Sequence, residues 1–241
     1  MLFRRKNISL LVTAFTILFL FTLFNLLFPQ SWLIETLSPY ICPNAVYFKT
    51  TDKPIITLTI DDSPDPQTTK EILAVLNKYK VKATFFTISN RVLKNPEVTQ
   101  AIVKAGHEIG NHLTKDEPSI RLGENFEPEL AKAHKILSNY STNINWFRPG
   151  SGFCDRSMID IAKQYNYQTA LGSVWSYDTN IPSSKFATWF ILANTKPGSI
   201  IVLHDIGDRG ERTVKTLENI IPKLQKKGYQ FVTLSNLEPL M

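Results

Sequence analysis

The sequence predicts an α/β domain built on a parallel sheet, with one apolar helix ahead of it. From Ile55 onward, short runs rich in β-branched and aromatic residues alternate with helical patterns. About seven such units are present, enough to close into a barrel rather than an open sheet. Before them, the run from Ile8 to Phe28 carries no charge. The chain of 241 residues suits one domain plus this smaller part.

Seven segments are predicted as strands because they are short, apolar and β-branched or aromatic. They cover residues 55–60, 83–88, 108–112, 144–148, 168–173, 199–204 and 230–234. The clearest helical patterns between them are residues 68–79 and 211–228. The second pattern stops at Gly228 and places one apolar stripe on a single face, formed by Leu217, Ile220, Ile221 and Leu224.

The apolar run from Ile8 to Phe28 predicts a membrane span, since it is long enough to cross about 30 Å of hydrocarbon as a helix. No small-residue cleavage pattern follows it, which favours an uncleaved anchor over a signal peptide. A buried soluble helix would need cover on every side. Arg4, Arg5 and Lys6 precede the run, so the positive-inside tendency predicts a plasma-membrane protein whose domain lies outside the cytoplasm.

The predicted organisation has four parts. Residues 1–7 form a basic cytoplasmic N-terminus, and residues 8–28 form a single-pass signal anchor. Residues 29–53 form a linker that partly packs on the domain, and residues 54–241 form the domain itself.

Net charge limits the classes of partner that the chain can bind, and cysteine content indicates its redox compartment. The net charge is +6, and three of the positive charges precede the apolar run. The rest of the chain is mixed in charge and has no dense Lys/Arg tract, which argues against a nucleic-acid partner and leaves room for weak attraction to an anionic cell wall. Cys42 and Cys154 suit an oxidising compartment. They either pair, tying the segment after the anchor to the domain, or stay separate thiols.

Polar residues gather at the ends of the predicted strands, where chemistry collects in parallel α/β folds. Alone, each would be interpreted as a cap or an ion-pair partner. Together, at the same end of successive strands, they predict one site. They are Asp61, Asp62, His112, Arg148, Asp178, His204 and Asp205.

Five motifs occur in order at these strand ends. They are TIDD at residues 59–62, GNHLTKD at 110–116, FRPGSG at 147–152, WSYD at 175–178 and VLHD at 202–205. Over most of residues 54–237 the chain thereby resembles the polysaccharide deacetylases of the NodB-homology type, carbohydrate esterase family 4. The resemblance implies a distorted (β/α)7-type barrel. It also implies a metal-dependent hydrolase that removes acetyl groups from N-acetylated sugars.

The resemblance assigns catalytic roles to the strand-end residues. Asp61 is expected to be the general base, and Asp62 a metal ligand. A metal lowers the pKa of bound water and polarises the acetyl carbonyl, and a free carboxylate beside it can take the proton. His204 is expected to be the general acid, and Asp178 would raise its pKa. Arg148 is expected to hold Asp61 charged and oriented.

The predicted metal site departs from the family pattern. The family supplies a second His four positions after the first, but here Asp116 stands four positions after His112. A carboxylate can ligate zinc, and the spacing of four suits one face of a helical turn. We therefore expect Asp62, His112 and Asp116 to bind a divalent metal, zinc first, with cobalt or manganese as alternatives. The other interpretation is that Asp116 only caps the next segment and the site is weakened.

The predicted substrate-facing wall also departs from the pattern. Gly150, Ser151 and Gly152 replace the more usual proline and tyrosine, yet a backbone N–H near Ser151 can still bind an oxyanion. Trp175 is the predicted sugar-stacking residue. Where the family has a second Asp and a Trp in the fourth motif, this chain has Ile181 and Pro182.

Taken together, the sequence predicts a membrane-anchored, extracytoplasmic, metal-dependent deacetylase of an N-acetylated glycan, with peptidoglycan or a chitin-like oligosaccharide as substrate class. One alternative is a non-catalytic wall-binding protein that kept the barrel and lost the metal. A second alternative is a hydrolase of another small amide or ester.

Overall fold

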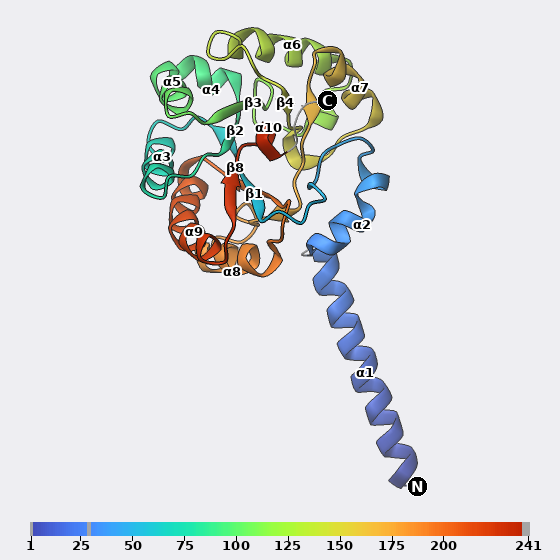
Figure 1. Cartoon of the computed structure of the whole chain (residues 1–241). Coiled ribbons are helices and arrows are strands. Elements are labelled where there is room, and N and C mark those ends of the chain that lie inside the picture. Colours follow the sequence, from blue (N-terminus) through green and yellow to red (C-terminus); the bar gives the residue numbers. More distant parts are fainter. Residues whose placement is uncertain (1, 28–29, 238–241) are drawn as a thin grey trace.

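Eight parallel strands form one curled sheet at the centre of the fold (Figure 1). The structure is a computed structural model, and it describes residues 2–27 and 30–237. Along the sheet the strand order is β5-β4-β3-β2-β1-β7-β6, and β8 also pairs with β1. The strands are β1 (Ile55–Ser63), β2 (Thr84–Thr87), β3 (Glu108–Asn111), β4 (Trp146–Phe147), β5 (Gln168–Thr169), β6 (Val174–Trp175), β7 (Ile200–His204) and β8 (Gln230–Val232).

The predicted parallel α/β architecture is confirmed, but the sheet is a half-barrel and not a closed barrel. Each of the seven predicted segments contains a strand, and β6 is an eighth strand that was not predicted. β5 and β6, at the two ends of the strand order, are not paired with each other in the part of the chain that the structure describes. Only residues 170–173 join them, which leaves no room for the crossover helix that a parallel pair needs.

Residues from the predicted linker lie beside the open part of the sheet. Val46 forms a parallel bridge with Ala170, and Phe48 forms an antiparallel bridge with Ser199. The segment of residues 42–54, ahead of β1, therefore contacts the chain on both sides of the gap, just after β5 and just before β7.

Helices surround the sheet and bury its outer face (Figure 1). The stripe predicted on residues 211–228 is buried as expected, and its helix begins a few residues earlier. The surrounding helices are α3 (Thr68–Lys78), α4 (Ser89–Lys94), α5 (Pro96–Lys104), α6 (Phe126–Leu137), α7 (Arg156–Gln164), α8 (Ser184–Asn194) and α9 (Gly207–Lys226). The short helix α10 (Leu234–Leu237) lies inside this ring in the view of Figure 1.

The central strand β1 anchors the core and positions the site. It pairs with β2, β7 and β8, and eight of its nine residues are buried. Ile56, Leu58 and Ile60 belong to the main apolar cluster, where each contributes about 1.5–3 kcal/mol by leaving water. Neighbouring strands therefore hold the carboxyl end of β1 in place, and this end carries the two adjacent aspartates.

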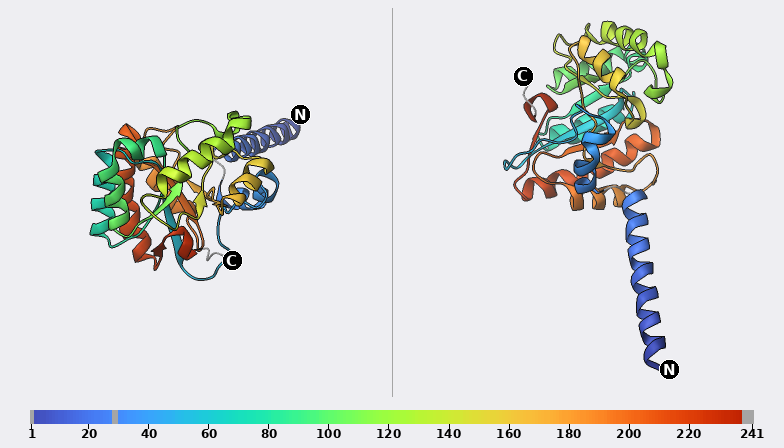
Figure 2. Two further views of the ribbon diagram at one scale, coloured as in Figure 1. Left: turned by 90° about the horizontal axis from the view of Figure 1, so that it is seen from above. Right: turned by 90° about the vertical axis from the view of Figure 1, so that its right-hand side faces the viewer.

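Two helices precede the domain. α1 (Leu2–Leu27) projects away from it, and α2 (Ser31–Ile41) lies against it (Figures 1 and 2). A disulfide between Cys42 and Cys154 ties the end of α2 to the domain, which decides between the two predicted states of these cysteines. Lys196 Nζ and Glu35 Oε2, 2.6 Å apart, add an ion pair.

The membrane span predicted over residues 8–28 is not confirmed. Among the helices in the described residues, none combines the length and the apolarity needed to cross a membrane. Residue 28 of the predicted span lies outside the described residues.

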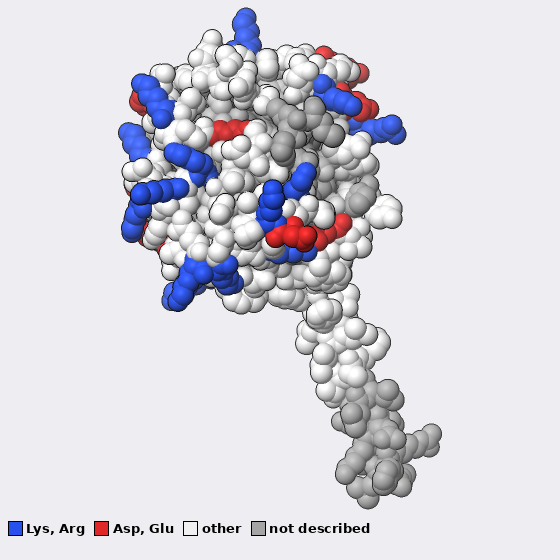
Figure 3. Space-filling view, viewed as in Figure 1, with Lys and Arg blue, Asp and Glu red and all other residues white. Residues whose placement is uncertain are grey.

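Charged side chains are dispersed over the face of the molecule in Figure 3. Lys and Arg lie over several elements there, with Asp and Glu between some of them. This is the mixed surface that the composition indicates.

Candidate active site

A cavity of about 410 Å³ lies at the carboxyl ends of β1, β3, β4 and β7. All nine residues predicted for the site line it. They come from five separate stretches of the chain, and they meet because the carboxyl ends of parallel strands share one edge of a sheet. The structure therefore brings the predicted residues together, while their chemical roles remain predictions.

The two adjacent aspartates reach this cavity through a break in β1. In a regular strand, neighbouring side chains point to opposite faces. Asp62 has φ 68°, and the register between β1 and β2 shifts between Ile60 and Ser63. A non-glycine residue in this left-handed region costs about 1–3 kcal/mol, and such conformations cluster at functional sites. The break allows Asp61 and Asp62 to line the same cavity.

Asp61 forms a buried ion pair with Arg148. Arg148 Nη1 lies 2.6 Å from Asp61 Oδ1 and 2.7 Å from Thr59 Oγ1. Arg148 Nε donates to the carbonyl oxygen of Ala170 at 2.9 Å, and the guanidinium lies over the Phe86 ring at 4.1 Å. These contacts hold Asp61 in one orientation at the floor of the cavity.

Asp61 stabilises the positive charge of Arg148. Burial lowers the pKa of this guanidinium, and the charge and hydrogen bond of Asp61 oppose that effect. Arg148 Nη2 is buried and has no hydrogen-bond partner within the described part of the chain. A buried donor without a partner is unusual, and a water or substrate oxygen in the cavity would satisfy it.

His204, which is partly buried, pairs with the buried Asp178. His204 Nδ1 lies 2.8 Å from Asp178 Oδ1, and the backbone N–H of His204 donates to Asp178 Oδ2 at 3.2 Å. Burial alone would lower the pKa of His204, but the negative charge and hydrogen bond of Asp178, followed by Asp61 and Asp62, raise it to about 9. At neutral pH the imidazole is therefore protonated. With Nδ1 bound to Asp178, Nε2 is the nitrogen left to donate a proton.

The predicted acid and the predicted base are neighbours in the sheet. Asp61 on β1 is the register partner of His204 on β7. In a parallel pair, register partners place their side chains on the same face. The pairing thus sets a carboxylate and an imidazolium side by side on one wall of the cavity.

Two of the three predicted metal ligands suit a metal ion. His112 Nδ1 lies 2.7 Å from the carbonyl oxygen of Arg148, which can only accept, so Nδ1 carries the proton. The other nitrogen, Nε2, faces Asp62 Oδ1 at 3.7 Å. Two ligands at about 2.0–2.2 Å from one zinc ion lie at a comparable separation.

The third predicted ligand does not join this pair. Asp116 Oδ2 lies 3.5 Å from Arg91 Nη2 and 3.6 Å from Arg209 Nη2. Among the described residues, no group of three or more His, Cys, Asp or Glu is arranged to hold a metal ion. The residues present therefore do not fit a three-ligand metal site.

The loop after β4, which the sequence predicts to face the substrate, forms one wall of the cavity. Ser151 has φ 66°, and Gly152 has φ 68°. A Cβ on Gly152 would lie 2.5 Å from the Trp175 ring, so glycine allows the indole to pack against this loop. Trp175 Nε1 donates to the carbonyl oxygen of Gly172 at 3.3 Å. Ser151 and Trp175 are thus both held at the rim of the cavity.

Sequence reasoning missed two arginines that line or border the cavity. Arg209 lies in the first turn of α9, directly after the VLHD motif, and Arg91 lies on α4, after β2. The only signal for Arg209 was its place at the start of a helix that follows a catalytic strand. Arg91 belongs to no motif.

Asp205, which the sequence also predicted at this site, does not line the cavity and has a structural role next to it. It accepts hydrogen bonds from Ser63 at 2.9 Å, from Thr68 at 2.6 Å and from Thr69. Burial raises its pKa to about 6, against the effect of these hydrogen bonds. Asp205 therefore fixes the loop that follows the two aspartates of β1.

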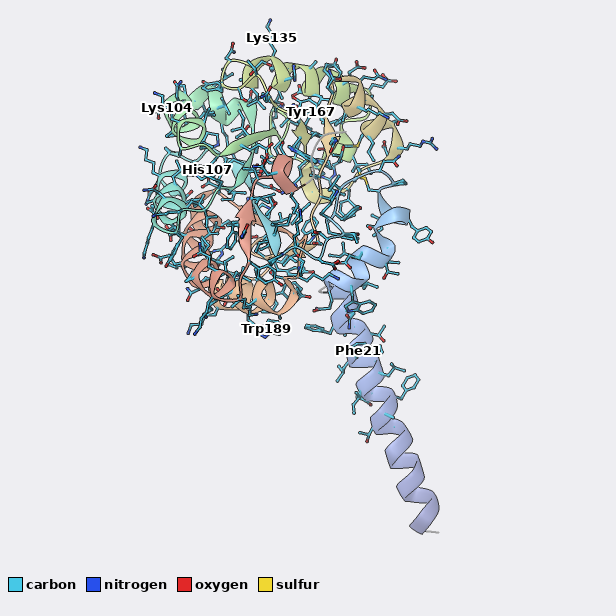
Figure 4. All side chains as sticks on the ribbon, in the orientation of Figure 1. Phe21, Lys104, His107, Lys135, Tyr167 and Trp189 are labelled. Carbon is cyan, nitrogen blue, oxygen red and sulfur yellow. A yellow bond between two sulfur atoms is a disulfide. The ribbon has the colours of Figure 1, made fainter. Side chains whose placement is uncertain are left out.

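Other histidine and tryptophan side chains lie away from the cavity. His107 is buried against the sheet, where its Nδ1 accepts the N–H of Ala83 at 3.2 Å and burial lowers its pKa to about 4 (Figure 4). Trp189 lies on the outer side of α8, is 53% exposed and does not line the cavity (Figure 4).

Comparison with known proteins identifies the family. A family model described as polysaccharide deacetylase matches residues 48–170. A peptidoglycan-N-acetylglucosamine deacetylase of Bacillus cereus is 37% identical over 187 residues, which make up 76% of this chain and 87% of that protein.

Two solved structures share the fold. A peptidoglycan N-acetylglucosamine deacetylase superposes with a TM-score of 0.76 at 29% identity, over 84% of this chain and 95% of that one. A pseudoenzyme of carbohydrate esterase family 4 from Bacillus anthracis superposes with a TM-score of 0.72 at 25% identity, over 81% of this chain and 69% of that one. The family match and the Bacillus cereus relative together show that the chain belongs to the polysaccharide deacetylase family.

Proposed function

We propose that this chain is a hydrolase that removes N-acetyl groups from an N-acetylated glycan, with peptidoglycan as the first substrate class and a chitin-like oligosaccharide as the second. The observation that carries the proposal is that Asp61 and His204 lie side by side on neighbouring strands in one cavity. Arg148 holds Asp61 in place, and Asp178 holds His204. The name of the Bacillus cereus relative supports the choice of peptidoglycan.

The reaction needs one base and one acid. Asp61 takes a proton from the water that attacks the acetyl carbonyl carbon, and a C–O bond forms. A backbone N–H near Ser151 stabilises the oxyanion. His204 then donates its proton to the sugar nitrogen as the C–N bond breaks, which releases acetate and a free amine. The raised pKa of His204 supplies the protonated form that this step requires.

The proposal includes a divalent metal because the family resemblance implies one. Zinc is the first choice, and cobalt or manganese are the alternatives. Asp62 and His112 are the residues whose geometry suits it, and Asp116 stays the predicted third ligand. When bound, such an ion lowers the pKa of water and polarises the carbonyl.

We also propose that the domain works outside the cytoplasm, held at the plasma membrane by residues 8–28 as a single-pass anchor. The uncharged run with basic residues before it supports the anchor. The Cys42–Cys154 disulfide supports an oxidising compartment.

A non-catalytic glycan-binding protein is the second candidate. The observation that favours it is the pairing of Asp116 with two arginines. The structural similarity to a pseudoenzyme of the same family adds weight to it.

The deciding experiment measures acetate released by the full chain from N-acetylated oligosaccharides and from peptidoglycan, first metal-free and then with zinc, cobalt or manganese. Asp61→Asn removes the base, and Asp160→Asn, on the exposed surface of α7, is the matched control. We expect release by the wild type and by the control and none by Asp61→Asn. No release by a folded wild type under any condition would favour the glycan-binding protein. Release only from other amides or esters would favour the alternative hydrolase.

A further inference from the structure

Two arginines from different elements converge on the carboxylates that the sequence assigns to a metal. Arg209 Nη1 lies 3.3 Å from Asp62 Oδ2, and its Nη2 lies 3.6 Å from Asp116 Oδ2. Arg91 Nη2 lies 3.5 Å from the same oxygen of Asp116, and Arg91 Nη1 donates to the backbone carbonyl of Asp62. Arg209 therefore bridges the two carboxylates, and Arg91 supports the arrangement from the other side.

The cluster is balanced in charge without any added ion. Two guanidinium groups face two carboxylates, so the positive charge that a metal would supply is already present. Asp62 is almost fully buried, whereas the side chains of Asp116 and Arg209 are 45% and 30% exposed. Exposed pairs of this kind are weak, so Arg209 can be displaced from Asp116 more easily than a fully buried partner could be.

We propose that Arg209, supported by Arg91, is a built-in cation that competes with a divalent metal for Asp62 and Asp116. The chain then binds divalent metal weakly, and Arg209 sets how weakly. A unit positive charge about 5 Å from a divalent ion weakens its binding by roughly tenfold even when water screens the pair, and by more in a partly buried site. Removing that charge strengthens metal binding at Asp62 and His112.

The same geometry explains why Asp116 stands apart from the other two predicted ligands. Its carboxylate is held by two guanidinium groups, so it is engaged as an ion-pair partner. Without Arg209, Asp116 keeps only Arg91 as its ion-pair partner and is therefore less firmly held away from Asp62 and His112. The contribution of Asp116 to metal binding therefore depends on whether Arg209 is present.

The test measures metal affinity directly, by calorimetric titration of zinc and of manganese into the metal-free full chain. Arg209→Gln removes the bridging charge, and Arg91→Gln removes the supporting one. Arg156→Gln is the matched control because Arg156 is highly exposed on α7. Asp62→Asn identifies which binding event belongs to this site, since that event disappears in the variant. Circular dichroism melts establish that each variant is folded.

We expect Arg209→Gln to bind metal at least about tenfold more tightly than the wild type, Arg91→Gln to show a smaller gain, and Arg156→Gln to show none. Adding Asp116→Asn should reduce affinity in the Arg209→Gln background and change it little in the wild type. Unchanged or weaker affinity in Arg209→Gln would overturn the proposal, as would an equal gain in Arg156→Gln. If Arg209→Gln does not fold, Arg209→Met is the second neutral variant, with the same expected result.

This inference rests on the proposed function only for the assignment of Asp62 and His112 to the metal, and the two can fail separately. Tighter metal binding by Arg209→Gln with no acetate release by any variant would refute the proposed function and leave the inference standing. Acetate release by the wild type with no gain of metal affinity in Arg209→Gln would support the proposed function and refute the inference.

Discussion

The two halves of the cavity are built differently. In the acid–base half, Asp61–Arg148 is a buried pair with a contact of 2.6 Å, and His204–Asp178 is a largely buried pair with a contact of 2.8 Å. In the cationic half, Arg209 and Arg91 reach Asp62 and Asp116 at 3.3–3.6 Å, and Asp116 is half exposed. Short buried contacts favour one arrangement, whereas longer exposed contacts can be exchanged for other partners. The acid–base half is thus preorganised, and the cationic half is replaceable.

The largest expected effect is on stability in the acid–base half. Arg148→Met removes the partner of buried Asp61 and leaves that carboxylate without a counter-charge. We expect a loss of about 3–5 kcal/mol in the free energy of unfolding, measured by urea denaturation. Arg156→Met is the exposed control and should change stability little. A loss below about 1 kcal/mol for Arg148→Met would show that this half is no more rigid than the other.

The next effect is on activity. His204→Gln removes the proposed acid and keeps a polar side chain of similar size. We expect the rate of acetate release to fall by about 10²–10⁴-fold, with the fold preserved. His134→Gln, on helix α6 and outside the cavity, is the control. Equal rates in wild type and His204→Gln would remove His204 from the mechanism.

The pH dependence gives a third way to examine the acid–base half. Since the pKa of His204 is raised to about 9, its protonated form is present below that pH and is lost as the pH rises through it. The rate of acetate release should therefore decline on the alkaline side near pH 9. Asp178→Asn removes the charge that raises this pKa while burial still lowers it, so the decline should move toward neutral pH. A pH profile that is unchanged in Asp178→Asn would show that Asp178 does not set the pKa of the proposed acid.

The two halves also differ in how far the sequence could predict them. The strand-end residues were predictable because parallel strands bring their carboxyl ends to one edge, and all of them except Asp205 line the cavity. Arg91 and Arg209 come from helices that follow the strands, and their reach depends on helix placement and side-chain direction, which no local pattern encodes. The conformation of Asp62, with φ 68°, was equally invisible, because no glycine marks that position.

The fold shows the same division. The helical stripe on α9 and the seven strand segments follow from periodicity, which is a local property. Closure of the barrel is not local. The barrel does not close because residues 168–173, which were expected to form one strand, contain only the short strand β5, and the separate short strand β6 begins two residues after Gly172, which has φ 108°. The pairing of Cys42 with Cys154 likewise required the positions of two distant segments.

The smallest expected effect lies in the cationic half. Asp116→Asn removes a half-exposed carboxylate whose partners are two partly exposed arginines, and solvent screens such pairs. We expect a change of less than about 1 kcal/mol in the free energy of unfolding, measured by the same urea denaturation as Arg148→Met. A loss comparable to that of Arg148→Met would mean that Asp116 is fixed as firmly as Asp61. The cationic half would then be as preorganised as the acid–base half, and exchange of Arg209 for a metal ion would require the whole cluster to rearrange.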